Sequence, residues 1–399
     1  MSPSERERDR AARLMLSIVG EPGDPRLASL VEQEGAVGAL EYLRARGRGG
    51  RGGLGEALAE RIASARPDET LAGAERRGLR FVTPADDEWP APLEDLREVP
   101  ALHERGGTPV GLWLRGPSRL DDAVAGAVAV VGARSATTYG AAVAAAIGGE
   151  LAEAGVPVVS GAAFGIDQAA HRGVLAARGT TVAVLACGAD RVYPTAHQAL
   201  VQYIAETGLI VSEAPPGGAP TRIRFLARNR LIAALSVGTV VVEAAVRSGA
   251  LNTANWADGL SRALMGVPGP VTSAASQGVH LLIRNRNALL VTGGGEVLEA
   301  VGLLGGRPGG SAPAGPVRRR DALPGLEREV LDAVPVRRGA TADRIARVAG
   351  LPPEVVAKAL VRLHVAGFVE RSAELWRLAS DPSDPSVAPA ETGGGDFVP

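Results

Sequence analysis

The chain has almost no cysteine and almost no lysine. Its 399 residues include one cysteine, Cys187, and one lysine, Lys358. A single cysteine excludes an internal disulfide framework and a zinc site built from several cysteines. Because arginine supplies nearly all of the positive charge, any basic surface must consist of guanidinium groups, which can grip a phosphate through two parallel hydrogen bonds.

Aromatic residues and net charge are also scarce. The chain has four Trp, four Tyr and five Phe, and its formal net charge is −1. A nucleic-acid surface must therefore be a local patch, and base stacking is limited to isolated positions such as Phe164, Tyr193 or Phe225. Hydrophobic residues make up 46% of the chain, which is ample for two or three domain cores.

Several functional motifs are missing from the sequence. There is no GxxxxGK[ST] loop, no HExxH and no GxSxG, which excludes a P-loop ATPase and argues against a zincin or a serine hydrolase. The apolar run Leu14 to Val19 is too short for a signal peptide, and no run reaches the ~20 residues that span a bilayer. We expect a cytoplasmic protein with no membrane, metal or cofactor site and no catalytic residue.

Buried strands alternate with helices from about residue 125 onward. This pattern predicts an α/β fold, an extended Rossmann-like and mostly parallel sheet with helices on both faces. Ligands in such sheets bind beyond the carboxyl ends of the strands. The predicted strands are Ala127–Val131, Val156–Ser160, Thr181–Leu185, Leu209–Ser212, Thr239–Val242, Leu264–Val267 and Leu289–Val291.

Shifts in composition predict flanking domains. The first part reads as short helices that resemble a SAM or helix-hairpin-helix domain, with contact to protein or to DNA both open. Three helices and a two-stranded wing near the end indicate a winged helix, again with DNA or protein as its partner. The predicted domains are 1–80 (helical), 81–305 (Rossmann-like with a lead-in segment), 306–322 (linker), 323–379 (winged helix) and 380–399 (disordered tail).

The segment Thr221–Thr253 carries the clearest functional signal. It has four arginines within nine residues and no acid among them, followed by a buried strand and a small turn, Ser248-Gly249, that opens a helix. Guanidinium groups and a helix N-terminus both bind anions. The segment predicts a phosphate-rich ligand, and its arginines are Arg222, Arg224, Arg228 and Arg230.

Other turns that leave strands offer further candidates. Arg134 lies in the turn Gly132–Gly140, which departs from the GxGxxG fingerprint of dinucleotide sites. His171 could act as a general base or fix the turn before it by a hydrogen bond. Glu213 and Glu243 follow strand ends and could serve a hydrolase or pair with the nearby arginines; we prefer the second role.

Together these turns resemble the DNA-processing protein A family (DprA, also called Smf). The resemblance covers about residues 12–300. It rests on the stretches VAVVGARSATTYG, VVSGAAFGIDQAAHRG, VAVLACGADRVYP, LIVSEAPPGG, FLARNRLIAALSVGTVVVEAAVRSGALNTA and VPGPVTSAASQGVHLLI.

The resemblance implies a non-enzymatic protein that binds and protects incoming single-stranded DNA. It also implies a homodimer formed through the Rossmann-like domain, and loading of RecA recombinase during natural transformation and recombination. The DNA-binding residues expected from the motifs are Gly132, Arg134, Gly161, Gly165, His171, Tyr193, Arg228, Asn229, Arg230, Ser248, Gly249 and Thr253.

The chain departs from the family pattern in places. The usual SGSLITA reads SGALNTA, so that Asn252 stands in place of isoleucine, and the basic residue often found after Tyr193-Pro194 is missing. Arg284 and Arg286 are candidates to compensate for that missing charge.

Two rival functions stay open. One is a nucleotide phosphoribohydrolase of the LOG group, for which the stretch from Gly238 to Glu243 is similar but the preceding Pro-Gly-Gly is absent. The other is a regulator that reads duplex DNA through the winged helix.

Overall fold

The computed structural model describes residues 2–46, 54–302 and 319–379. The chain divides into two compact units, Met1–Gly310 and Ser311–Pro399. The predicted tail and most of the predicted linker lie outside the described residues, and the domain boundary at residue 80 stays a prediction. Across the three described ranges, no helix is both long and apolar enough to cross a membrane.

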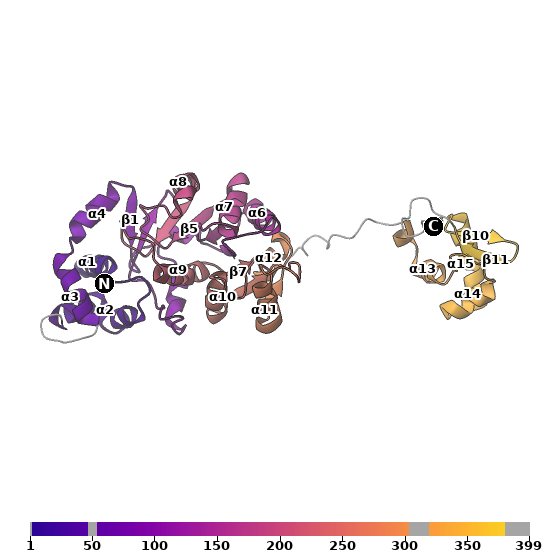
Figure 1. Ribbon diagram of the computed structural model, residues 1–399, viewed down its shortest axis with the longest axis horizontal. Coiled ribbons are helices and arrows are strands. Elements are labelled where there is room, and N and C mark those ends of the chain that lie inside the picture. The colour runs from indigo at the N-terminus through magenta and orange to yellow at the C-terminus, as the bar shows by residue number, and fades with distance from the viewer. Residues whose placement is uncertain (1, 47–53, 303–318, 380–399) are drawn as a thin grey trace, which may run out of the picture. The chain divides into compact units, whose positions relative to one another are not determined.

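A nine-stranded sheet forms the centre of the first unit (Figure 1), in the order β1-β2-β6-β5-β4-β3-β7-β8-β9. All pairings among β3 to β9 are parallel, so the predicted parallel sheet is confirmed. These strands are β3 (Val128–Val131), β4 (Val158–Ser160), β5 (Thr181–Leu185), β6 (Leu209–Ser212), β7 (Gly238–Val241), β8 (Ala263–Gly266) and β9 (Leu289–Leu290).

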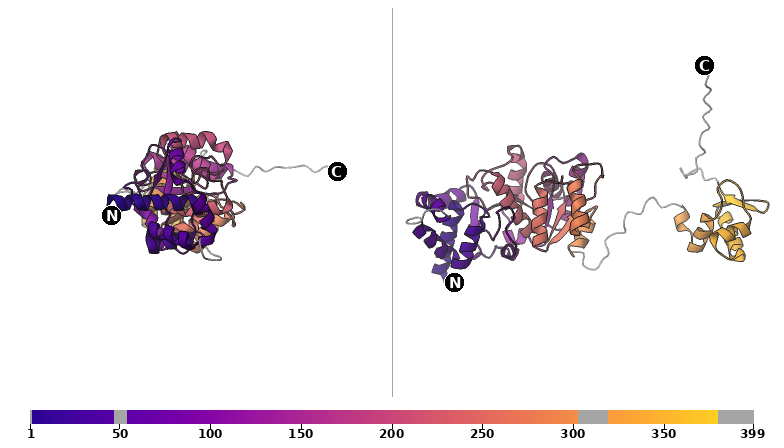
Figure 2. Two further views of the ribbon diagram at one scale, coloured as in Figure 1. Left: turned by 90° about the vertical axis from the view of Figure 1, so that its left-hand side faces the viewer. Right: turned by 60° about the horizontal axis from the view of Figure 1, so that its bottom comes forward.

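Helices cover both faces of the sheet (Figures 1 and 2). Alternate residues of a strand point to opposite faces. In β3, Val128 and Val130 pack among the residues of one helix layer, and Ala129 and Val131 among those of the other. The first face is covered by α6 (Thr138–Glu153), α7 (Ile166–Ala176), α8 (Gln198–Thr207) and α12 (Gly294–Ala300), and the second by α9 (Arg222–Ala234), α10 (Ala250–Gly259) and α11 (Gln277–Arg286).

The lead-in segment adds two strands that the sequence did not predict. β1 (Leu79–Val82) pairs antiparallel with β2 (Leu112–Arg115), which in turn pairs antiparallel with β6. Between and after them lie the short helices η1 (Ala91–Arg97) and α5 (Leu120–Ala123). Each new strand has only four residues, too few for a clear alternation of polar and apolar side chains.

Four helices precede the sheet: α1 (Pro3–Val19), α2 (Pro25–Arg46), α3 (Leu54–Ser64) and α4 (Pro67–Glu75). The helical N-terminal region is confirmed. α2 has a kink at Gly35, where φ is 70°, which separates its two parts. Trp113 of β2 donates to Ser17 Oγ of α1 at 2.9 Å, which joins the helices to the sheet.

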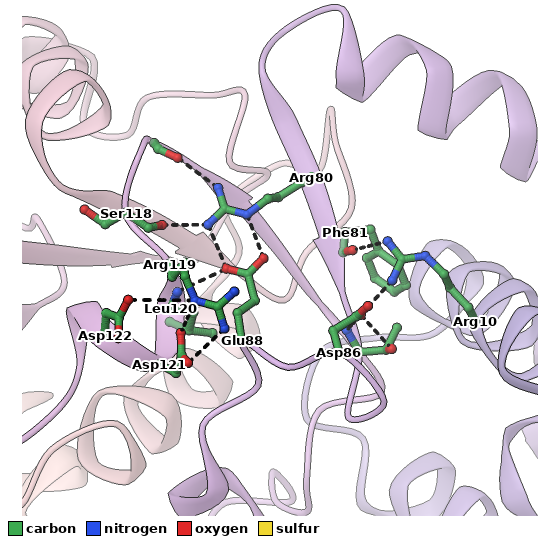
Figure 3. A network of polar contacts seen from close by, with 12 residues as sticks. Arg10, Arg80, Phe81, Asp86, Glu88, Ser118, Arg119, Leu120, Asp121 and Asp122 are labelled. Carbon is green, nitrogen blue, oxygen red and sulfur yellow. Dashed lines mark hydrogen bonds and ion pairs between the residues drawn. The ribbon is translucent and has the colours of Figure 1, made fainter. Parts of the chain in front are cut away.

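Ion pairs fasten the lead-in segment on two sides, as Figure 3 shows. Arg80 of β1 bonds both carboxylate oxygens of Glu88, at 2.9 and 2.8 Å, and the Ser118 carbonyl at 2.6 Å. Arg10 of α1 pairs with Asp86 at 2.6 Å. The loop that follows β1 is therefore held both to the sheet and to the N-terminal helices.

The second unit has its own core and the element order expected of a winged helix. It contains η3 (Arg319–Ala322), α13 (Gly325–Asp332), α14 (Ala342–Ala349), α15 (Pro353–Val365) and the antiparallel hairpin of β10 (Val369–Ser372) and β11 (Leu375–Leu378). Ala340 bridges to Trp376 and adds a third backbone segment to the wing. Val330, Ile345 and Leu360 form the apolar centre between the helices.

Candidate nucleic-acid interface

The strand order reverses at β3, and a groove lies at that point. β3 has β4 on one side and β7 on the other. The loops that leave β3 and β7 therefore diverge, and this is where open α/β sheets bind ligands. A groove of about 1180 Å³ lies there, lined by both loops, by α9 and by the start of α10. The site predicted from the strand ends thus coincides with a groove of ligand size.

The groove is basic although the whole chain is nearly neutral. One carboxylate, Asp167, lies among the described residues of its lining. Against it stand five arginines from four separate segments: Arg134, Arg222, Arg228, Arg247 and Arg286. Converging guanidinium groups at a concave surface attract phosphate.

Arg134 and two aromatic rings form the exposed side of the groove. The guanidinium carbon of Arg134 lies 4.4 Å from the centroid of the Phe225 ring, a cation–π contact. The Tyr193 ring lies 5.7 Å from the Phe225 ring, and Tyr193 is exposed. Arg134 makes no ion pair within the described residues, so its charge is available to a ligand.

Arg228 lies in the floor of the groove and is only 6% exposed. Its Nη1 approaches Asp167 Oδ2 at 3.9 Å and the Val184 carbonyl at 3.4 Å. Burial lowers the pKa of Arg228 and raises the pKa of Asp167, because each charged form loses water. A Cβ atom on Gly161 would overlap the Arg228 guanidinium, so Gly161 makes room for this arginine.

The turn after β7 brings backbone and amide groups to the groove. Ser248, Gly249 and Thr253 all line it, and Gly249 is the N-cap of α10, as predicted from the turn. Asn229 of α9 donates to the Gly249 carbonyl at 3.3 Å and to Asn252 Oδ1 at 3.2 Å. These bonds fix the start of α10 against α9.

Eight of the twelve expected residues line the groove, and their contact with DNA stays a prediction: Gly132, Arg134, Tyr193, Arg228, Asn229, Ser248, Gly249 and Thr253. The other four are absent from its lining: Gly161, Gly165, His171 and Arg230.

Arg230 was predicted to contact DNA, but it lies away from the groove. It lies on the side of α9 that faces the sheet and the N-terminal segment, where it is fully buried. Its guanidinium bonds both oxygens of Glu213 at 2.7 Å and the Gly107 carbonyl at 3.0 Å. The preferred role of Glu213, pairing with an arginine, is confirmed.

His171 and Gly165 are likewise structural. His171 is fully buried, and its Nδ1 lies 2.7 Å from Thr181 Oγ1. It is hydrogen-bonded as the second alternative expects, but to strand β5 and not to the turn before it. Gly165 has φ of 80°, and a Cβ there would overlap the Ala133 carbonyl. Asp167 accepts from the Gly161 and Ala163 amides and so fixes the same turn.

Glu243 holds the turn after β3 instead of pairing with an arginine. Its carboxylate accepts from the Thr137 amide at 2.9 Å and from Thr137 Oγ1 at 2.5 Å. Thr137 in turn caps α6. The expected arginine partner was therefore wrong for Glu243.

Polar groove residues that were not predicted from the sequence include His103, Arg247 and Asn252. Arg247 could have been found, since it directly precedes the turn Ser248-Gly249. Asn252 was noted only as a departure from a pattern. His103 comes from the lead-in segment and gives no local signal. Of the two arginines proposed to compensate, Arg286 lines the groove, whereas Arg284 is not part of the lining.

Comparison with known proteins shows the family of the chain. The family model of DNA recombination-mediator protein A matches residues 80–302. A Mycobacterium tuberculosis protein that carries the name DNA processing protein DprA is 45% identical over 369 residues, which cover 91% of this chain and 92% of that protein. Protein Smf of Escherichia coli is 39% identical over 251 residues, 61% of this chain and 65% of its own length.

A solved structure shares the fold as well as the sequence motifs. DNA processing protein A from Streptococcus pneumoniae matches with a TM-score of 0.60 and 32% identity, over 73% of this chain and 97% of that one. The family match spans more than half of the chain and contains every residue that lines the groove. The chain therefore belongs to the DNA recombination-mediator protein A family, the family of the DprA and Smf proteins.

Proposed function

We propose that this protein binds single-stranded DNA in the basic groove, protects it and delivers it to RecA recombinase in the cytoplasm during natural transformation and recombination. The observation that carries the proposal is the convergence of five arginines on a groove at the switch point of the sheet. Membership of a DNA-processing family supports the choice of DNA over a free nucleotide.

The groove favours a single strand over a duplex. Arginines can follow the phosphates, and the exposed ring of Tyr193 in the groove offers a flat face to an unpaired base. Backbone contacts dominate such binding, so affinity should fall steeply with salt and depend little on sequence.

A titration of labelled oligonucleotides tests this proposal. Single- and double-stranded oligonucleotides of one sequence are titrated with the full-length protein at two salt concentrations, and fluorescence anisotropy is measured. We expect preference for the single strand at both salt concentrations. Equal affinity for both forms would contradict the proposal and move the DNA site to the winged helix.

We also propose that the protein is not an enzyme. Glu243, the residue that a LOG-type phosphoribohydrolase would use, is 2% exposed and bonded to Thr137. Incubation with nucleoside monophosphates should release no free base. Turnover that persists after repurification and disappears in Glu243→Gln would overturn this part.

The proposed homodimer has a candidate contact at the edge of the sheet. β9 is the last strand, and its two residues, Leu289 and Leu290, are 51% and 53% exposed. Exposed apolar edge strands tend to pair with another chain. Sedimentation should show a dimer for the wild type and a monomer for Leu290→Asp.

RecA delivery is tested by RecA filament growth on strands that the protein already covers.

A further inference from the structure

The lead-in segment sends one side chain, His103, into the basic groove. Leu102 and Arg105 bond each other through both backbone pairs, at 2.8 and 3.0 Å, so His103 and Glu104 are the two central residues of a tight hairpin. Both have positive φ, 52° and 60°. This geometry is that of a type I′ turn, which strongly prefers Asn-Gly.

An unfavourable sequence at a strained turn is a sign of function. His103 and Glu104 both carry a Cβ in a backbone region that favours glycine. The turn nevertheless persists, because the segment around it is held firmly. Gly106 donates to the Gly23 carbonyl at 3.0 Å, and Arg230 donates to the Gly107 carbonyl at 3.0 Å. The hairpin therefore holds the backbone of His103 in a fixed position.

A chain of amides determines which ring nitrogen of His103 carries the proton. Asn229 Nδ2 donates to the Gly249 carbonyl and to Asn252 Oδ1. Since the oxygen of Asn252 is used in this way, its Nδ2 is the group that faces His103 Nδ1, at 3.3 Å. Nδ2 can only donate, so His103 Nδ1 accepts, and the neutral ring carries its proton on Nε2.

The two amides are fixed by burial, whereas the histidine is exposed. Asn229 and Asn252 are 8% and 6% exposed, and both line the groove together with His103. The chain Asn229–Asn252–His103 thus begins in α9, passes through α10 and ends on a ring at the groove. It orients the Nε2–H group as a hydrogen-bond donor in the groove that Arg134 also lines.

We propose that His103 is a further DNA contact, which donates from Nε2 to a phosphate or base oxygen of the strand in the groove. The proposal rests on the proposed single-strand function of the same groove. It makes the lead-in segment part of the binding wall, oriented by Asn252 and Asn229. Because the neutral ring adds a donor and no charge, it strengthens binding without adding to the release of counterions.

Substitution by asparagine separates the role of the turn from the role of the ring. Asn is favoured in the left-handed region, so His103→Asn should relax the turn and keep or raise the melting temperature. Its side chain is too short to replace Nε2, and single-strand affinity should fall about 3- to 10-fold. Asn252→Leu, which keeps the shape and removes the amide, should weaken binding similarly, and the double variant should be no weaker than either single one.

The salt dependence of binding distinguishes the outcomes. His103→Asn should leave the slope of log affinity against log salt unchanged, whereas Arg134→Ala should reduce it by about 0.7. Glu104→Gln, on the same turn and outside the groove lining, is the matched control and should bind normally. If Arg134→Ala loses affinity while His103→Asn and Asn252→Leu bind like the wild type, the inference about His103 is wrong and the proposed function stands. If the wild type itself binds no single strand, the proposed function fails.

Discussion

A buried histidine and a buried threonine link α7 to the strands β5 and β4. Thr181 Oγ1 donates to the Val158 carbonyl and so accepts from His171 Nδ1. The other ring nitrogen, Nε2, is then an acceptor, buried and without a partner among the described residues. Burial lowers the pKa of His171 to about 3, with smaller contributions from Arg228 and His197.

This environment predicts a pH dependence of stability. In the unfolded chain a histidine binds its proton near pH 6.5, whereas folded His171 stays neutral down to about pH 3. The unfolded state therefore binds more protons between these values, and acidification destabilises the fold by up to about 1.4 kcal/mol per pH unit. His171→Asn keeps a donor to Thr181 and cannot titrate. Chemical denaturation at pH 7 and pH 5 should show that acidification lowers the free energy of unfolding less in this variant than in the wild type. An equal decrease in both proteins would contradict the low pKa of His171.

Gly161 leaves the space that the buried guanidinium of Arg228 occupies. A methyl group at this position would overlap the guanidinium of Arg228, which is only 6% exposed. Gly161→Ala should lower the free energy of unfolding by about 1–3 kcal/mol and weaken single-strand binding, because it displaces Arg228 from the floor. Gly295→Ala is the control, since nothing lies within 4 Å of its added Cβ. Wild-type stability of Gly161→Ala would show that Arg228 can adopt another position.

Residues at strand ends were predictable, whereas the direction of side chains on a helix was not. Arg134 and Gly132 follow a recognisable strand, and the rule for ligands at strand ends places them in the groove. Arg228 and Arg230 are two positions apart in α9 and therefore point to different sides of the helix. Which side faces the groove depends on Glu213 and the N-terminal segment, far away in the sequence.

Helix α9 is the element that joins the groove to the N-terminal region. Its groove side carries Phe225 and Asn229, and its other side carries Arg224 and Arg230. Arg224 bonds Glu21 at 2.7 and 3.0 Å, from the segment between α1 and α2. Two ion pairs thus fix α9, which forms one wall of the groove.

The buried pair of Arg230 and Glu213 should matter for stability and hardly for DNA. Glu213→Gln keeps the shape and leaves the buried charge of Arg230 without its partner, which costs about 3–5 kcal/mol. Denaturant unfolding should show this loss, while single-strand affinity of the folded variant stays within about twofold of the wild type. A loss of affinity without a loss of stability would mean that the pair contributes to the DNA site directly.

The elements differ in how far the sequence predicted them. The buried runs that became β5 and β6 gave the correct bounds, because continuous apolar stretches between turns are a strong signal. β1, β2 and α4 were not predicted. The antiparallel edge depends on β2 meeting β6, a contact between distant parts of the chain that leaves no local pattern.

At the scale of the whole molecule, the groove lies entirely within the first compact unit. The winged helix presents a different kind of surface. Its helix α15 exposes Val361 and Val365, at 51% and 85%, next to the single lysine, Lys358. Such a face offers few hydrogen bonds to base edges, which favours protein contact over DNA contact for this unit.

Truncation after Gly310 tests this division of labour. The first unit has its own core clusters and contains every residue of the groove lining. We expect the truncated protein to bind single strands with an affinity within about twofold of that of the full-length chain. Its weak affinity for duplex DNA should equal that of the full-length chain. A drop of tenfold or more in either affinity would place a DNA contact in the winged helix.

The charge of the whole molecule makes the central claim testable at a single residue. Since the formal net charge is −1, salt-dependent DNA binding must come from a local basic surface, and the groove is the surface that we propose. The most direct measurement is the slope of log affinity against log salt for a single-stranded oligonucleotide, in the wild type and in Arg134→Ala. Arg172→Ala, an exposed arginine on α7 outside the groove, is the control. We predict a slope shallower by about 0.7 for Arg134→Ala alone; an unchanged slope and affinity would contradict single-strand binding in this groove.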